Sequence, residues 1–535
     1  MAAQQMKKEL SFLDLTMASL GAIIGSGWLL AGQAAAVGAG PSALLSWLIA
    51  GVVIMFIGLV YAELGAMFPE AGGIVRYPQY SHGHMVSFII GWSAWIAYSA
   101  LPAVESEAVV TYAQSYVPAF SGPHGTISAA GLGVAAGLMV LFFIINYFGV
   151  RTFARINTTV TFLKFIMPSL TIVIFLIFGM HWSNFHSHGF MPDGTAGMMK
   201  VVSTAGVVFS YLGFRQAIDL SGEAKNPQKD VPRAIIFSLI LGILIYTLLQ
   251  FVFLGAVQPQ DLIHGWSGLN YSAPFAQLAI AMNLSWFGMF IFADAILSPS
   301  GTGNIYIATL SRLLYALAKN RYFPRALLYI DPKTGVPLVA LATGVLVGLA
   351  FLAPFPAWQA LVAVASSAAV LTYISGPVSS AALRRLAPDI HRPVRTAALS
   401  VLGPLAFIGG SLIIYWTGWN TDKPLLGLIL VGIVLYGLFS WLMPGQIEHP
   451  SRDALKASAW FIVYLLFMLA MSYYGSGVFG APANHGRGFI PYPYDLFVLA
   501  LASLGFYFWG VHSAYMTPDL KEKLAQPASS SSQSA

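Results

Sequence analysis

Long apolar segments alternate with short polar connections along nearly the whole chain. A helix needs about 20 consecutive apolar residues to cross a bilayer, and fourteen stretches of that kind can be counted. They fall near residues 15–38, 42–67, 86–117, 127–148, 154–179, 197–222, 232–257, 284–318, 338–353, 357–383, 398–418, 424–443, 455–474 and 494–515. The pattern predicts an all-α integral membrane protein with about 14 transmembrane helices.

The first predicted span is interrupted in its middle by glycines. Gly21, Gly25 and Gly27 fall within seven residues, and glycine is about 1 kcal/mol less favourable than alanine in a helix. Backbone that leaves the helix inside a membrane has to be satisfied by protein or by water in a cavity. We therefore predict a break over Ile24–Trp28, after which a second half-helix directs free amides and its positive dipole end into the gap. Such a terminus favours an anion.

The sixth predicted span has a similar interruption. Phe209–Phe214, with a glycine inside it, divides the apolar run Val201–Leu220. Two interrupted helices at matching places predict two repeats of five helices, with a substrate site between the breaks. An alternative remains open, because Gly21 and Gly25 also have the GxxxG spacing that packs helices against each other.

Composition excludes an ordinary soluble enzyme. The chain is 57% hydrophobic and 9% charged, whereas soluble domains carry about 25% charged residues. There is no cysteine and no GxxxxGK[ST] phosphate loop, so neither a thiolate metal site nor an ATP-driven pump is indicated. The loop histidines lack carboxylate companions. We expect no enzymatic activity, no metal and no cofactor.

The positive charges predict the orientation. The formal net charge is +6, and most of the 26 lysines and arginines lie in loops on one side of the predicted spans. The positive-inside rule then places both termini in the cytoplasm of a multi-pass cell-membrane protein. The lysines and arginines of the cytoplasmic loops account for the net positive charge, so the charge does not indicate a nucleic-acid partner. Residues 1–14 are predicted as a short cytoplasmic N-terminus and residues 516–535 as a disordered cytoplasmic tail.

Several stretches form a recognisable set of motifs. They are Gly25-Ser26-Gly27, Tyr61–Leu64, Pro69–Gly73, Phe209–Phe214, Glu223–Pro232 and Ser311–Ala316. As a set they resemble the amino acid–polyamine–organocation transporter superfamily. Within it, Arg76–His84, Asp294–Pro299 and Tyr415–Trp419 resemble the bacterial aspartate–proton symporter group.

The resemblance implies a five-plus-five inverted-repeat transporter fold with discontinuous helices 1 and 6. The first repeat would span 15–179, the second 197–386, and four peripheral helices 398–515. The substrate α-carboxylate would lie on the amides of Ile24–Gly27 and its ammonium on nearby carbonyls, with Phe209 closing over it. The predicted substrate-binding residues are Ala22, Ile23, Ile24, Gly25, Ser26, Gly27, Phe209, Ser210, Leu212, Gly213 and Arg215.

Ionisable side chains inside the spans are functional candidates, because each costs roughly 2.5–3.5 kcal/mol to insert. Lys164 shares a polar helical stripe with Asn157 and Thr161. The resemblance places it where sodium-coupled relatives hold an ion between helices 1 and 8. Burial disfavours an ammonium ion, so Lys164 is a candidate proton carrier, or else a static bridge between helices. Glu105 and Asp294 complete the predicted proton-coupling set, although Asp294 could equally be a neutral, hydrogen-bonded acid holding helices together.

Arg215 and Asp219 are four residues apart on a helix and can pair with each other. Alternatively, Arg215 grips an acidic substrate side chain, since guanidinium matches carboxylate bidentately. Many superfamily relatives carry an acid where Arg215 stands, and the reversed sign fits an anionic substrate. Glu63, near the end of the second span, is expected to cap or to pair with basic residues on the cytoplasmic side.

The predicted function is proton-coupled secondary active uptake of an acidic amino acid, aspartate or glutamate. Its partners would be the amino acid, protons and the lipid bilayer, and the proton gradient would take the place of a cofactor. Alternatives within transport are an amino-acid exchanger or a neutral amino-acid permease. Alternatives of another class are a non-transporting nutrient sensor and a respiratory-type proton-channel subunit. No oligomeric state is predicted.

Overall fold

The computed structural model describes residues 8, 10–70, 72–123, 126–148, 150–352, 357–443, 445, 447–479 and 488–525, and the side chains of all of these except 150–159. This part of the chain is helical, with two isolated β-bridges, Leu10–Ala224 and Ser121–Ile127, and no strand. The all-α prediction is confirmed.

The first five predicted spans each overlap helices, and a short helix, α4, precedes the third. These helices are α1 (Phe12–Ile23) with α2 (Gly27–Ala39), α3 (Ala43–Met67), α4 (Gly73–His82), α5 (His84–Ala113), α6 (Ala129–Tyr147) and α7 (Val150–Phe178).

The next five spans begin with a second broken element, and a short helix, α11, lies between the seventh and eighth. The helices in this part of the chain are α8 (Gly194–Thr204) with the 3₁₀ helix η5 (Phe209–Arg215) and α9 (Gln216–Asp219), α10 (Pro227–Ala256), α11 (Pro274–Ala281), α12 (Ser285–Lys319), α13 (Leu338–Leu352), and α14 (Trp358–Tyr373) with α15 (Ser375–Leu386). The last helices are α16 (Leu399–Thr417), α17 (Trp419–Leu442), α18 (Arg452–Tyr474), α19 (Tyr494–Ser513) and α20 (Pro518–Ala525).

Ten described helices are long and apolar enough to cross a membrane, and the pair bent by 45° around the second break makes eleven. The three remaining predicted spans are not counted, because their helices are too short or too polar to cross a membrane alone. In the first span α1 is short and α2 continues into α3 as one apolar stretch, Gly27–Met67. α12 is long but carries polar residues along its length, and α13 has only 15 residues.

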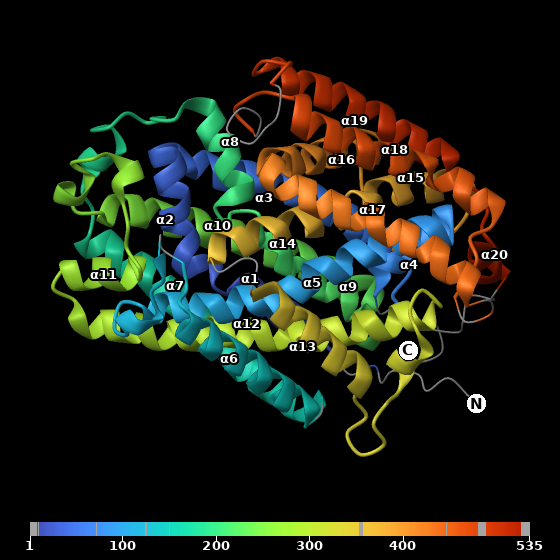
Figure 1. Ribbon diagram of the computed structural model, residues 1–535, viewed down its shortest axis with the longest axis horizontal. Helices are drawn as coiled ribbons and strands as arrows, with labels where there is room; N and C mark the ends of the chain where they lie inside the picture. Colours follow the sequence, from blue (N-terminus) through green and yellow to red (C-terminus); the bar gives the residue numbers. More distant parts are fainter. Residues whose placement is uncertain are drawn as a thin grey trace.

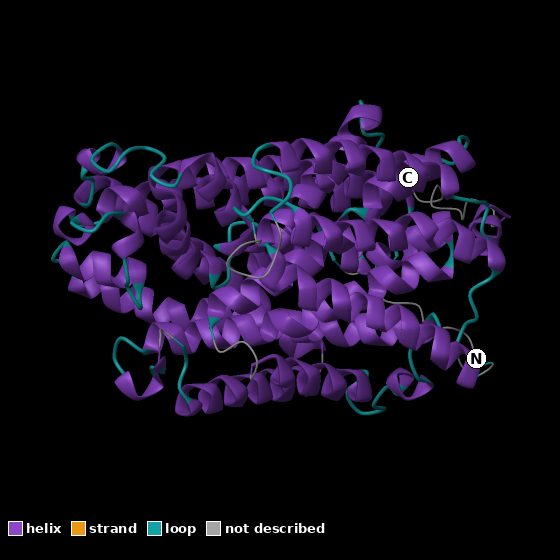
Figure 2. Ribbon diagram, turned by 45° about the horizontal axis from the view of Figure 1, so that its top comes forward, coloured by secondary structure: helices purple, strands orange, loops and turns teal. Residues whose placement is uncertain are grey.

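Two predicted spans, formed by α5 and by α14 with α15, make up the centre of the bundle. α5 and α14–α15 are almost wholly buried, whereas α6, α17 and α19 keep most of their apolar surface outside. A helix that is apolar all round is expected either in a protein core or in contact with lipid. Here α5, α14 and α15 are in the core because other helices surround them. α5 packs on α12 and α14, and α3 packs on α10. The peripheral helices α16–α19 gather along one side, in orange and red in Figure 1, and Figure 2 shows the same layered bundle turned by 45°.

Glu63 lies at the end of α3, where it pairs with basic side chains as predicted. Its carboxylate accepts hydrogen bonds from the guanidinium of Arg384 and from the Thr396 amide at 2.7 Å, and Arg392 lies 3.8 Å away. The carboxylate is buried, so the cluster ties α3 to α15 and to the segment before α16.

Glu63→Ala is expected to lower the thermal stability of the purified protein. Removing one member of a buried ion pair leaves the other uncompensated, which costs about 3 kcal/mol. Thermal unfolding in detergent measures the effect, and the exposed Asp389→Ala is the matched control. Equal melting temperatures for the two variants would contradict this account of the cluster.

The C-terminal segment is partly ordered, in contrast to the expectation of disorder from residue 516. α20 lies against α4, with Leu520 buried. Lys523 donates to Glu70 at 2.7 Å, and Gln79 donates to Asp519 at 3.1 Å. Burial alone would raise the pKa of Glu70, but Lys523 and Arg76 outweigh it and hold the pKa below its usual value. Residues 526–535, predicted as disordered, lie outside the described residues.

Candidate functional site

The first helix is broken where the glycines predict. α1 ends at Ile23, α2 begins at Gly27, and the three residues between them are not helical. The Ser26 amide donates to a carboxylate oxygen of Glu105 at 2.8 Å. The N-terminus of the second half-helix therefore holds an anion, as expected of such a terminus, and in this structure the anion is a side chain from α5.

The second break lies a few residues earlier than predicted. α8 ends at Thr204 and η5 begins at Phe209, so Phe209–Phe214 is a tightly wound 3₁₀ helix and not the interruption itself. The chain turns at Gly206, whose φ of +85° is one that side-chain-bearing residues rarely adopt. Gly213 has a different role from the one predicted: a Cβ there would collide with the backbone of Ala22 and Ile23.

Two of the glycines therefore allow the two broken helices to approach each other closely. Gly213 allows η5 to approach the end of α1, and Gly27 leaves room for the hydroxyl of Ser210, which a Cβ at Gly27 would overlap. Ser210 itself donates to the Gly206 carbonyl at 2.8 Å. The structure thus brings together the two glycine-rich segments that are far apart in the sequence.

Gly213→Ala is expected to reduce uptake strongly, because backbone atoms of α1 cannot move aside as a flexible side chain can. Overpacking of this kind costs about 1–3 kcal/mol, and here it also separates the two breaks. Gly427→Ala on α17 is the control, since nothing lies within 4 Å of the added methyl group. Transport assays normalised to protein amount check the result; normal uptake by Gly213→Ala would show that the close approach is unnecessary.

Three tyrosines occupy three of the four carbonyls predicted to bind the substrate ammonium, those of Ala22, Ile23, Phe209 and Leu212. Tyr246 donates to Ile23 at 2.7 Å, Tyr306 to Ala22 at 3.4 Å and Tyr373 to Leu212 at 3.2 Å. Sequence reasoning missed all three tyrosines, and no spacing along the chain distinguishes them from other buried tyrosines. In this structure these three carbonyls accept hydrogen bonds from hydroxyl groups.

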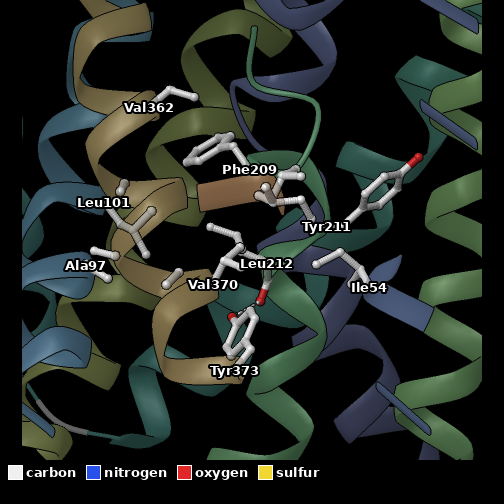
Figure 3. Close-up of a cluster of buried hydrophobic side chains, with 14 of the residues drawn as sticks. Ile54, Ala97, Leu101, Phe209, Tyr211, Leu212, Val362, Val370 and Tyr373 are labelled. Atoms are coloured by element: carbon white, nitrogen blue, oxygen red, sulfur yellow. Dashed lines mark hydrogen bonds between the residues drawn. The ribbon is translucent and has the colours of Figure 1, made fainter. Parts of the chain in front are cut away.

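An aromatic pair covers the site from one side. The Phe209 ring meets Trp358 of α14 edge-on at 6.1 Å between centroids, and the Trp358 indole donates to the Ser26 hydroxyl at 2.9 Å. Figure 3 shows Phe209 and Leu212 facing Val362 and Val370 of α14. Trp358 was also missed by the sequence reasoning, and it links both breaks to α14.

Lys164 lies between the first and eighth spans. Its ammonium donates to the Gly21 carbonyl and to the Thr302 hydroxyl, and Thr302 in turn lies 3.0 Å from the Gly21 carbonyl. Ser298 donates to the Ile24 carbonyl at 3.2 Å. The ammonium thus contacts the freed Gly21 carbonyl and the Thr302 hydroxyl, and Thr302 also lies 3.3 Å from the Ile24 carbonyl. Of its predicted stripe, Thr161 is buried, and the Asn157 side chain lies outside the described residues.

The two other predicted coupling residues are carboxylates that act electrostatically on Lys164. Glu105 contacts the Ser26 amide through one oxygen, and its second oxygen has no hydrogen-bond partner among the described residues. Asp294 accepts from the Trp28 indole at 3.1 Å, and its second oxygen is likewise without a partner in the described chain. The three ionisable groups form one buried set with unused acceptors.

Arg215 shows features of both predicted alternatives. Its Nε donates to Asp219 at 3.1 Å, as expected for the intrahelical pair, and Asp219 also accepts from Tyr98 at 2.9 Å. The guanidinium lies over the Tyr98 ring, 4.1 Å from its centroid. Both terminal guanidinium nitrogens are buried and have no partner among the described residues. The Tyr373 hydroxyl lies close to this guanidinium and interacts with it electrostatically.

Two broken helices packed against each other in a membrane bundle, with a buried lysine and two buried carboxyl groups beside the breaks, are the arrangement of a secondary transporter with the five-plus-five inverted-repeat fold. The model of the amino acid permease family matches residues 10–469, and the chain belongs to that family. Its members are transporters and not enzymes.

Two curated relatives from Bacillus subtilis match almost the whole chain. The glutamate/serine transporter AimA is 42% identical over 97% of this chain and 96% of its own length. The aspartate-proton symporter is 41% identical over 95% of this chain and 96% of its own length. A third, the branched-chain amino acid permease BcaP, is 27% identical over 82% of this chain and 94% of its own. The resemblance stated from the motifs is confirmed, and it rules out the proton-channel subunit.

Proposed function

We propose that this protein is a proton-coupled symporter of acidic amino acids in the cell membrane, with both termini in the cytoplasm. The observation that carries the proposal is the buried set formed by Lys164, Glu105 and Asp294 around the first break. The names of its two similar relatives, which mention glutamate, serine, aspartate and protons, support the substrate class. We assign the two repeats to 15–179 and 197–386 and the peripheral helices to 398–515.

The substrate lies between the breaks. Its α-carboxylate binds the amides of Ile24–Gly27 at the positive end of α2, and its ammonium binds the carbonyls near Ala22, Ile23, Phe209 and Leu212. When the substrate binds, its ammonium replaces the tyrosine hydroxyls as the donor to the carbonyls of Ala22, Ile23 and Leu212. The remaining predicted residues, Ser210 and Gly213, hold the two breaks together, and Phe209 closes the site with Trp358.

Proton coupling follows from competition for one amide. Glu105 occupies the Ser26 N–H, which the substrate carboxylate also needs. Two carboxylates cannot share that donor, because like charges repel at short distance. Protonation of Glu105 removes its charge and releases the amide, so substrate binds together with a proton. Lys164 and Asp294 set the charge around Glu105, and Lys164 holds the position between the first and eighth spans that a cation would otherwise take.

Substrate selection rests on Arg215. A buried guanidinium with two free nitrogens binds a carboxylate bidentately, and this fits the side chain of aspartate or glutamate. No metal or organic cofactor is required, and no cluster of three or more His, Asp or Glu residues suited to a metal is found in the described chain. The energy source is the proton gradient.

Transport by purified protein in proteoliposomes tests the function. With an acidic exterior, we expect aspartate or glutamate to accumulate against its own gradient, and a protonophore should abolish the accumulation. Unlabelled amino acids added as competitors give the specificity. Uptake that requires amino acid already inside the vesicles would identify an exchanger, and stronger competition by neutral than by acidic amino acids would identify a neutral permease. Binding with no flux in any format would indicate a sensor.

A further inference from the structure

Two adjacent apolar cavities lie where the peripheral helix α17 packs against α5. Their volumes are about 280 and 100 Å³, and both have Trp92 and Leu435 as walls. The larger reaches Val347 on α13, and the smaller is bounded by Phe88 and Tyr436. Pockets for small molecules measure roughly 300–1,000 Å³, so the two together reach the lower end of that range. We call them the Trp92 groove.

Trp92 keeps the groove in place. Its indole N–H donates to the Leu428 carbonyl of α17 at 3.2 Å. Its ring lies against Gly432, where an added Cβ would overlap the indole. The N–H edge of the Trp92 indole therefore lies directly against α17. The cavities therefore follow from a specific side-chain contact between the core and the peripheral helices.

The groove opens among side chains that face the bilayer. Leu346 on α13 and Val434 on α17 are 67% and 70% exposed, and Val431, which lines the groove, is 52% exposed. In a membrane-spanning bundle, outward apolar surface of this kind contacts acyl chains and not water. The molecule that fills the groove is therefore drawn from the membrane.

A basic rim borders one end of the groove. Tyr322–Pro324 line the smaller cavity, and exposed Lys319, Arg321 and Arg325 lie immediately before and after them in the chain. Arg321 is 57% exposed and donates a long hydrogen bond to the carboxylate of Glu448 at 3.5 Å, so a phosphate would compete with that carboxylate. Arg325 donates one hydrogen bond to the Gly445 carbonyl. Basic side chains beside an apolar groove at the membrane surface match an anionic phosphate carried on acyl chains.

We propose that the Trp92 groove binds an anionic glycerophospholipid. An acyl chain fills the apolar cavities between α5 and α17, and the phosphate binds Arg321 and Arg325. The same helix α5 carries Glu105, so the lipid packs directly on an element of the candidate transport site. This binding does not depend on the identity of the transported amino acid.

Native mass spectrometry of the full chain, delipidated in mild detergent, tests the proposal. Phosphatidylglycerol and phosphatidylcholine with identical acyl chains are titrated separately. We expect phosphatidylglycerol to bind at least tenfold more tightly, and Arg321→Ala and Arg325→Ala each to weaken it about fivefold. Leu435→Trp, which fills the groove, should weaken both lipids. Arg233→Ala, at another exposed basic position, and Val434→Trp, beside the groove but not lining it, are the matched controls.

Equal affinity of the wild-type chain for the two lipids would overturn the headgroup assignment. If Leu435→Trp and Val434→Trp weakened lipid binding equally, the groove would not be the site that holds the acyl chain. If Leu435→Trp instead changed the ratio of monomer to dimer without displacing lipid, the groove would be an interface between copies of the chain. Transport activity of Leu435→Trp measured in parallel confirms that the variant is folded.

Discussion

Lys164→Ala is expected to abolish uphill accumulation of the amino acid under an inward proton gradient, lowering it about 100-fold or more. The ammonium bridges the Gly21 carbonyl and the Thr302 hydroxyl, and it faces Glu105 and Asp294. Removing it leaves two buried carboxylates without their cation, and breaking such a set costs about 3–5 kcal/mol. Uptake into proteoliposomes at two external pH values measures the effect.

Two controls separate coupling from folding. Lys200→Ala removes an exposed lysine at the start of the sixth span and should leave uptake unchanged. Thermal-shift measurements with and without aspartate report whether Lys164→Ala still binds substrate. A variant that binds aspartate and exchanges it, but does not accumulate it, fits a lysine that takes part in proton coupling. Full uphill uptake by Lys164→Ala would remove the lysine from the coupling mechanism and leave the static bridge.

Arg215→Gln is expected to lower the preference for acidic over neutral amino acids about 10- to 100-fold. A hydrogen bond to a charged group contributes roughly 1.5–3 kcal/mol, and the two free guanidinium nitrogens offer two of them. Competition between labelled aspartate and unlabelled neutral amino acids measures the ratio. Arg215→Lys keeps the positive charge but lacks the planar guanidinium that binds a carboxylate through two nitrogens, so it should recover only part of the preference.

The partner of Arg215 complicates the single substitution. Asp219 accepts from both Arg215 and Tyr98, and Arg215→Gln alone leaves it as an unpaired buried carboxylate. The double variant Arg215→Gln with Asp219→Asn removes both charges and tests specificity without that cost. Arg233→Gln is the exposed control. An unchanged preference in the double variant would assign Arg215 to helix pairing alone.

The helical architecture could be predicted because lipid leaves few alternatives. Apolar runs of bilayer length give helices whatever their neighbours are, and the glycines of the first span locate its break to within two residues. Lys164 stood out as a functional candidate because an ionisable side chain in a span is costly, but its place between the first and eighth spans came from the family resemblance. The helices and the first break depend on residues close together in the chain.

Long-range contacts were beyond the same reasoning. Gly206 and Gly213 are alike in the sequence, but the first turns the chain and the second admits the backbone of α1. The difference lies in what faces each glycine. Likewise, Glu105 reaches Ser26 and Trp358 reaches the Ser26 hydroxyl only because α5 and α14 cross the first break. α20 packs against α4, and the polar composition of the tail gives no sign of this contact in the sequence.

A cryo-electron microscopy map of the full chain with aspartate at acidic pH tests the central claim most directly. The account predicts aspartate between the breaks, with its α-carboxylate on the Ile24–Gly27 amides, Phe209 over it, and Glu105 withdrawn from the Ser26 amide. A map that shows bound aspartate away from both breaks, with the contact between Glu105 and Ser26 intact, would contradict it.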